Sequence, residues 1–76
     1  MDRIDRIVKY IDLCLVKNHK EYYTAIEANK LLDEAGILRD RPERHGAPLR
    51  EILRAGLISH AYQFKGKHSK WYVPHS

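Results

Sequence analysis

The spacing of apolar residues changes at Gly56, and this change limits the folds that the chain can adopt. Before Gly56, apolar residues recur every three or four positions, which is the spacing of amphipathic helices. After it, residues 58–64 alternate between large side chains and small or polar ones, as a half-buried strand does. Because 76 residues form only one core of modest size, we expect a single small α+β domain over residues 1–76.

The first predicted helix covers residues 2–17. Its apolar stripe has spacings of three and four, and charged residues occupy the other side. The residues of the stripe are Ile4, Ile7, Val8, Ile11 and Leu15. Leu13 and Val16 fall outside the stripe, and we expect them to widen the core-facing side, with a small dimer contact as the alternative. Cys14, the only cysteine, is expected to be a reduced, packed thiol.

The second predicted helix runs from about Ala25 to Ala35 and carries signals for both of its ends. Thr24 is the expected N-cap, and Glu27 stands three residues later as its partner in a capping box. Gly36 follows the helix and is expected to adopt the left-handed conformation of a C-terminal cap. The residues expected on the inner face of this helix are Ala25, Ala28, Leu31, Leu32 and Ala35.

The remaining predicted elements are a short strand, a third helix and a hairpin. Residues 21–23 are expected to be extended, with one of the two tyrosines packed and the other facing solvent. The third helix is expected to run from Pro48 to Ala55, because proline fits the first position of a helix. Residues 39–47 before it are polar and are expected to form an irregular loop. Two strands and a basic turn then complete a hairpin: residues 58–64, 65–70 and 71–73.

This order of elements resembles the winged helix-turn-helix family. The stretch from Thr24 to Gly36 resembles the first motif helix with its turn glycine, and residues 49–58 resemble the second motif helix running into the hairpin. The strand at residues 71–73 completes the likeness. The resemblance implies three helices with a C-terminal β-hairpin wing, a third helix in the major groove of DNA and a wing on phosphate. The segment from Gly36 to Pro48 departs from the family, because it is longer than the usual turn.

Charge is distributed unevenly along the chain. Residues 1–37 carry seven acidic and six basic residues, a net charge of −1, whereas residues 38–76 carry eight basic and three acidic residues, a net charge of +5. The formal net charge of the whole chain is +4. A basic surface on a small domain indicates a polyanionic partner, most often nucleic acid.

The resemblance and the charge pattern favour one set of residues for binding double-stranded DNA. Arg50 and Arg54 lie four positions apart on one face of the third helix, where they can reach guanine edges or phosphates. Further contacts are expected from the loop before this helix, from the hairpin turn and from the start of the second helix. The ten expected contacts are Arg41, Arg44, His45, Arg50, Arg54, Lys65, Lys67, His68, Lys70 and Thr24.

Simpler roles are open to several of these residues. Lysines in a hairpin turn also keep a protein soluble and deter strand pairing. Arg54 can cap carbonyls at the end of its helix and pair with Glu51 or Asp40. Trp71 fits the core better than it fits stacking on a base. His60 is expected to be a strand residue held by a backbone carbonyl.

No pattern in the sequence indicates catalysis or a cofactor. None of the five histidines lies three or four residues from another and there is no second cysteine, so no metal site is expected. There is no nucleophile with a nearby base and no glycine-rich phosphate loop, so we expect neither an enzyme nor a small-molecule ligand. No apolar run approaches the ~20 residues of a membrane span, and no signal peptide is evident. We therefore expect a cytoplasmic protein, associated with the nucleoid when it is bound to DNA.

The function expected first is double-stranded DNA binding by a small transcriptional or mobile-element regulator. A lone winged helix makes few contacts, so useful affinity is expected to need either a homodimer or cooperative binding of neighbouring copies. The alternative is a winged-helix protein–protein docking module without specific DNA binding. RNA binding comes third and would need solvent-facing aromatic residues, for which Tyr22, Tyr72 and Trp71 are the candidates. We expect the chain to be complete, because it begins with Met1 and carries no tail.

Overall fold

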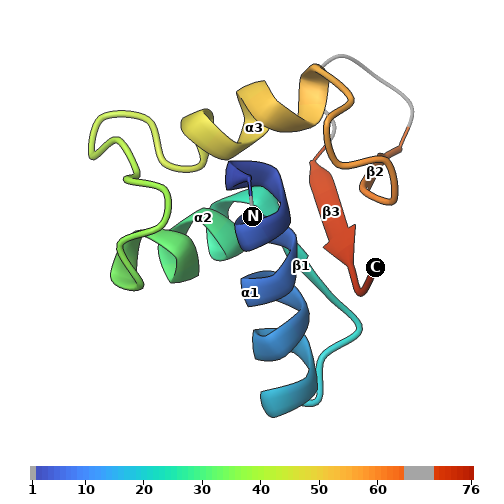
Figure 1. Cartoon of the computed structure of the whole chain (residues 1–76). Coiled ribbons are helices and arrows are strands. Elements are labelled where there is room, and N and C mark those ends of the chain that lie inside the picture. Colours follow the sequence, from blue (N-terminus) through green and yellow to red (C-terminus); the bar gives the residue numbers. More distant parts are fainter. Residues whose placement is uncertain (1, 65–69) are drawn as a thin grey trace.

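Three helices and three short strands make up the part of the chain that the computed structural model describes, residues 2–64 and 70–76 (Figure 1). In chain order they are α1 (Arg3–Lys17), β1 (Tyr22–Thr24), α2 (Ala25–Glu34), α3 (Ala47–Arg54), β2 (Tyr62–Gln63) and β3 (Trp71–Pro74). The prediction of a small α+β protein with three helices is confirmed. No helix in these two ranges is both long and apolar enough to span a lipid bilayer.

Local capping signals define where α1 and α2 begin. At α1, the Asp2 side chain accepts a hydrogen bond from the Asp5 N–H at 2.9 Å. At α2, the Thr24 hydroxyl accepts from the Glu27 N–H at 3.3 Å, and the Glu27 carboxylate accepts from the Thr24 N–H at 3.0 Å. Gly36 follows α2 with a φ of +71°. The predicted capping box and the predicted left-handed glycine are both confirmed.

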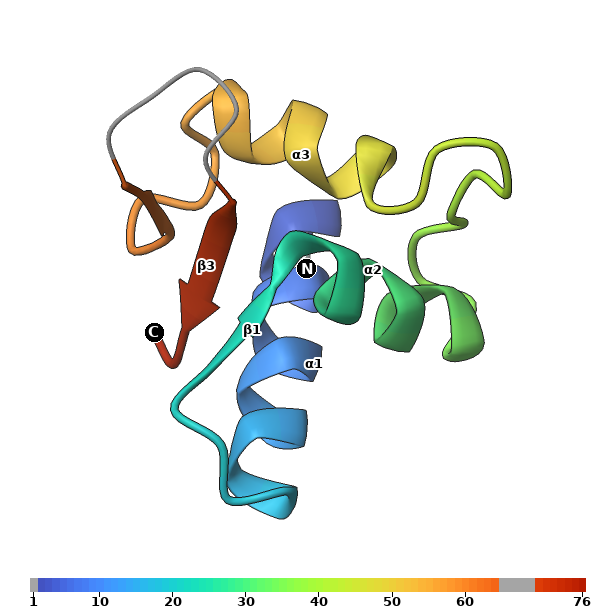
Figure 2. The same ribbon diagram turned by 180° about the vertical axis from the view of Figure 1, so that it is seen from behind.

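The sheet has the strand order β1-β3-β2, so the last strand of the chain lies in its middle (Figure 2). Both pairings are antiparallel, with Tyr23 opposite Val73 and Tyr62 opposite Tyr72. Tyr23 and Val73 are buried, whereas Tyr22 is 41% exposed. The expectation that one of the adjacent tyrosines packs while the other faces solvent is therefore confirmed.

The strand predicted over residues 58–64 is wrong in its first half, because only Tyr62–Gln63 pair with the sheet. The residues just before β2 form a turn, in which the Ala61 N–H donates to the Ile58 carbonyl at 3.2 Å. Ile58 is 3% exposed and holds this turn against the core. His60 thus lies in a turn, and its buried Nε2 has no hydrogen-bond partner among the described residues, contrary to the expected carbonyl contact.

The core lies between the helices and one face of the sheet. Its fully buried large apolar residues are Ile7, Ile11, Leu15, Leu32, Leu49, Leu53 and Val73. Cys14 is buried and free, as predicted. Leu13 and Val16 are 62% and 63% exposed, so the expectation that they widen the core-facing side was wrong. These two side chains point away from the elements that cover the apolar stripe of α1.

The inner face of α2 also differs from its prediction. Ala35 is exposed because it is the C-cap, beyond the last turn, whereas Asn29 is fully buried. Asn29 Nδ2 donates to the Leu38 carbonyl at 3.1 Å, and Asn29 Oδ1 accepts from the Leu49 N–H at 3.0 Å. Leu49 belongs to the first turn of α3, whose N-cap Gly46 supplies no side-chain hydrogen bond. Asn29 therefore caps α3 from a distance and fixes its position relative to α2.

Candidate nucleic-acid interface

The loop before α3 folds around the carboxylate of Asp40. Its Oδ1 accepts from the backbone N–H groups of Arg41 at 2.9 Å and of Gly46 at 2.8 Å, and its Oδ2 lies 3.2 Å from His45 Nδ1. The Asp40 side chain is only 10% exposed. These contacts hold the two ends of the loop together, and α3 begins directly after it at Ala47, one residue before the predicted start at Pro48.

The ionisation of Asp40 is set by two opposing effects. Burial raises the pKa of the Asp40 carboxyl, but hydrogen bonds from the Gly46 and Arg41 backbone and from His45 lower it, and the net pKa is below its ordinary value. Asp40 is therefore ionised at neutral pH, and it pairs with His45 when that ring is protonated. The pairing occupies Nδ1, although the His45 side chain remains 65% exposed. A contact of His45 with DNA would use the other edge of its ring.

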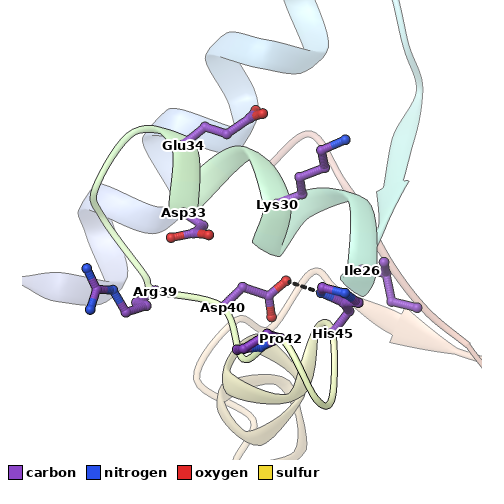
Figure 3. Close-up of a pocket in the computed structure, with 8 residues that line it drawn as sticks. All are labelled: Ile26, Lys30, Asp33, Glu34, Arg39, Asp40, Pro42 and His45. Atoms are coloured by element: carbon purple, nitrogen blue, oxygen red, sulfur yellow. Dashed lines mark hydrogen bonds and ion pairs between the residues drawn. The ribbon is translucent and has the colours of Figure 1, made fainter.

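A surface pocket of about 730 Å³ lies between this loop and α2 (Figure 3). Its lining residues are Ile26, Lys30, Asp33, Glu34, Arg39, Asp40, Pro42 and His45. Asp33 from α2 and Asp40 from the loop bring two carboxylates to the pocket, whereas the Glu34 carboxylate is directed away from the loop. Because carboxylates repel phosphate, this pocket is not part of the candidate interface.

Four predicted arginine contacts lie in the loop and on α3. Arg41 and Arg44 are exposed in the loop, Arg50 is half-buried on α3, and Arg54 is exposed as the last residue of that helix. Within residues 2–64 and 70–76, none of the four forms an ion pair. The pairing of Arg54 with a nearby carboxylate is therefore not found there. We refer to these four residues as the arginine surface.

The amphipathic character of α3 directs its two arginines outward. Leu49 and Leu53 are 0% and 1% exposed and face the core. Arg50 and Arg54 each follow one of these leucines, which turns them by about 100° from the core-facing direction. Figure 1 shows α3 at the edge of the molecule, with the loop at its start and the sheet near its end. The arginine surface thus extends from the loop along the outer side of one helix.

Four other predicted contacts belong to the hairpin turn. Lys65, Lys67 and His68 lie outside the described residues, and their roles stay predictions. Lys70 is exposed directly before β3 and lines a depression of the surface that Thr24 also lines. The structure therefore places Lys70 beside the start of α2.

The Thr24 hydroxyl is already engaged at the start of α2. It accepts from the Glu27 N–H and donates to Glu27 Oε1 at 3.1 Å. The hydrogen bond from the Thr24 backbone is the main cause of a lowered pKa of the Glu27 carboxyl; partial burial opposes it, while the Thr24 hydroxyl and the charges of Lys20 and Lys70 act in the same direction. A phosphate at Thr24 would meet this ionised carboxylate, and the predicted contact stays a prediction.

No family model, curated protein or solved structure matches the chain. In the ranges that the structure describes, no three His, Cys, Asp or Glu side chains gather as the ligands of a metal ion would. Among the described residues, the candidate interface consists of the arginine surface, Lys70 and the exposed edge of the His45 ring.

Two residues that shape the interface were not predicted from the sequence. Asn29 lies four residues after Ala25 and three before Leu32, which is the core spacing of α2, and a polar residue there must find partners inside. Asp40 precedes Gly46 in a polar loop, where aspartate often bonds to its own backbone. Both signals are present in the sequence, but neither identifies the partner.

The aromatic residues divide between core and solvent. Trp71 is half-buried and packs against the core, as predicted. Tyr22, Tyr62 and Phe64 are exposed by 41%, 41% and 65%. Of the three aromatic residues considered for RNA binding, Trp71 is thus directed inward, while two residues that were not considered, Tyr62 and Phe64, face solvent.

Proposed function

We propose that this chain is a winged-helix domain that binds double-stranded DNA, with α3 in the major groove and the hairpin between β2 and β3 on the phosphate backbone. The observation that carries the proposal is the arginine surface, whose four guanidinium groups form no ion pair with the described residues. Arginine is the side chain that most often contacts both phosphate oxygens and guanine edges. The three helices and the antiparallel sheet are compatible with the winged-helix fold.

The residues of the arginine surface divide into two roles. Arg50 and Arg54 on α3 contact base edges, because the major groove admits an α-helix and an arginine on it can bond to O6 and N7 of guanine. Arg41 and Arg44 contact the flanking phosphates, which sets the register of the protein on the duplex. The buried bridge from Asn29 to α3 supports the proposal, because a recognition helix must be held rigidly to present its side chains.

The proposed biological role is that of a small transcriptional or mobile-element regulator in the cytoplasm, acting as a homodimer. A dimer would double the few contacts that one winged helix makes. Leu13 and Val16 on α1 support this part of the proposal, because they are more than half exposed and apolar. They lie on a different helix from the arginine surface, so a second copy bound there would leave that surface open.

A salt series of fluorescence anisotropy with random duplex DNA, single-stranded DNA and duplex RNA tests the proposal. We expect micromolar affinity for duplex DNA, weaker binding to duplex RNA, and a steep decrease with salt as counterions are released. Absence of duplex DNA binding at low salt would overturn it. The arginine surface would then favour the docking-module function, with an acidic protein surface as partner.

Two substitutions locate the interface. Arg50→Ala and Arg54→Ala should each weaken duplex binding by about tenfold and lower the magnitude of the salt slope by about one. The matched control is Lys17→Ala, which also removes one exposed positive charge but lies at the far end of α1 from α3 (Figure 1). If Lys17→Ala weakens binding as much as the arginine variants do, the attraction is a general charge effect and α3 is not the interface.

A further inference from the structure

The outer face of the sheet carries a cluster of four aromatic residues that neither the core nor the proposed duplex interface uses. Tyr22 comes from β1, Tyr62 from β2, Tyr72 from β3, and Phe64 directly follows β2. The Tyr72 ring is central, with centroid distances of 5.1 Å to Tyr22, 5.6 Å to Tyr62 and 5.4 Å to Phe64. We refer to these four residues as the aromatic face.

The register of the sheet explains why these rings share one face. Tyr62 lies directly opposite Tyr72, and Thr24 lies opposite Tyr72 on the other side. Residues directly opposite in a sheet project to the same face, and so does Tyr22, two positions before Thr24. The intervening Tyr23 projects to the other face, where it is buried in the core. The helices therefore cover one face of the sheet and leave the aromatic face open.

The aromatic face is ordered by its own ring contacts. The Tyr62 and Tyr72 rings are stacked with an interplanar angle of 22°, while Tyr22 and Phe64 contact Tyr72 edge-on. These centroid distances are in the range of favourable aromatic pairs. Three of the four rings nevertheless remain at least 41% exposed to solvent. Exposed aromatic surface held in fixed positions is typical of a binding site rather than of a core.

Positively charged groups lie at one margin of the aromatic face. Lys20 and Lys70 line the depression beside Tyr22 and Tyr72, together with Glu21, Thr24 and Glu27. The Glu27 carboxylate is engaged there, because it accepts from Thr24 and lies 3.8 Å from the Lys20 ammonium group. Lys70 forms no ion pair with any described residue. The Lys70 ammonium group, whose charge also acts on Glu27, is thus the cation beside the rings that an anionic group of a ligand can contact.

We propose that the aromatic face binds unpaired bases of a single-stranded nucleic acid, with Lys70 beside the phosphate backbone. Stacking on aromatic rings combined with neighbouring cations is the chemistry by which proteins hold single strands without reading their sequence. The face is built from aromatic rings, with Thr24 and Pro74 as its other side chains, and the exposed aliphatic residues Leu13 and Val16 lie on α1. The Lys70 ammonium group at the margin favours an anionic strand as the occupant, because a phosphate group would pair with it.

The test measures anisotropy of labelled single-stranded DNA and RNA oligonucleotides of about 12 nucleotides. Tyr62→Leu and Phe64→Leu remove a ring but keep an apolar side chain, so they separate stacking from apolar contact. Each should weaken single-strand binding by about tenfold, and Phe64→Trp should restore it. Leu57→Ala is the control for an exposed apolar side chain elsewhere, because Leu57 is 56% exposed and lies outside the sheet, and it should have no effect. Lys70→Gln should lower the magnitude of the salt slope by about 0.7.

The outcomes separate this site from the proposed duplex interface. Arg50→Ala should weaken duplex binding and leave single-strand binding unchanged, and Phe64→Leu should do the reverse, so either site can fail alone. The inference is overturned if the wild-type chain binds neither oligonucleotide, or if the leucine variants bind as tightly as the wild type. It is also overturned if sedimentation shows a wild-type dimer that Phe64→Leu converts to a monomer, because a second copy would then cover the face.

Discussion

Replacing Asn29 with alanine tests whether one buried amide positions α3. Asn29 is 0% exposed and links two backbone groups that lie 11 residues apart, the Leu38 carbonyl at 3.1 Å and the Leu49 N–H at 3.0 Å. Both leucines are themselves buried, with exposures of 4% and 0%. Asn29→Ala would therefore leave one acceptor and one donor without a partner inside the protein.

The expected cost follows from these two unpaired groups. A buried backbone group that loses its partner costs about 1–3 kcal/mol, so the loss of two partners should lower the unfolding free energy by about 2–6 kcal/mol. A domain of 76 residues has a total stability of about 4–11 kcal/mol. At about 4–8 °C per kcal/mol for a domain of this size, the melting temperature should fall by about 8–48 °C.

Thermal and urea unfolding followed by circular dichroism measure this loss. Lys30→Ala is the matched control, because Lys30 is the next residue of α2 and is exposed. Asn29→Asp keeps an acceptor for the Leu49 N–H but places a carboxylate against the Leu38 carbonyl. Burial should raise the pKa of that new carboxyl, so the variant should regain stability as the pH falls. A loss below about 1 kcal/mol in Asn29→Ala would refute the bridge, since one net hydrogen bond is worth that much.

Two further changes test the loop before α3. The pKa of the Asp40 carboxyl is lowered in the folded state, so its contribution to stability is fully present above the ordinary pKa of about 3.9 and is lost as the pH falls through the lower folded pKa. Asp40→Asn should therefore reduce the loss of stability at acid pH, as measured by urea unfolding at several pH values. An unchanged dependence of stability on pH would contradict this prediction. Gly46→Ala should destabilise by about 1–3 kcal/mol, because Gly46 has a φ of +81° and its added Cβ would lie 3.1 Å from Ile26. Gly36 has a similar φ of +71°, but an added Cβ there would meet no atom within 4 Å. Gly36→Ala should therefore lower the unfolding free energy less than Gly46→Ala does, and the difference measures the cost of the contact with Ile26. Equal decreases for the two variants would show that this contact costs nothing.

The features predicted correctly are those encoded within a few residues. Thr24 and Glu27 form their capping box across three positions, and Gly36 adopts its left-handed conformation directly after the helix. Each of these interactions is complete within one or two helical turns, so the sequence shows both partners side by side. The ends of α1 and α2 were therefore predictable without knowledge of the tertiary structure.

The features that were missed depend on partners distant in the sequence. Asn29 bonds to a residue 20 positions away, and Leu13 and Val16 are exposed because of where the other elements pack. An apolar residue at the margin of the apolar stripe of a helix can face either the core or solvent, and the positions of the neighbouring elements decide which. The arginine surface was partly predictable, because the spacing of Arg50 and Arg54 shows that they share a face. Only the structure shows that neither forms an ion pair with a residue in the described ranges.

The aromatic face shows that a single turn within an alternating sequence changes which of its residues are buried. In a continuous strand over residues 58–64, Ile58, Tyr62 and Phe64 would project to the same side and would all be buried or all be exposed. The structure places Ile58 in the core at 3% exposure and Phe64 in solvent at 65%, because the turn closed by the Ala61 N–H separates them. The turn lets a small domain complete its core with Ile58 and present the next two aromatic rings, Tyr62 and Phe64, outward, where the proposed single-strand binding would use them.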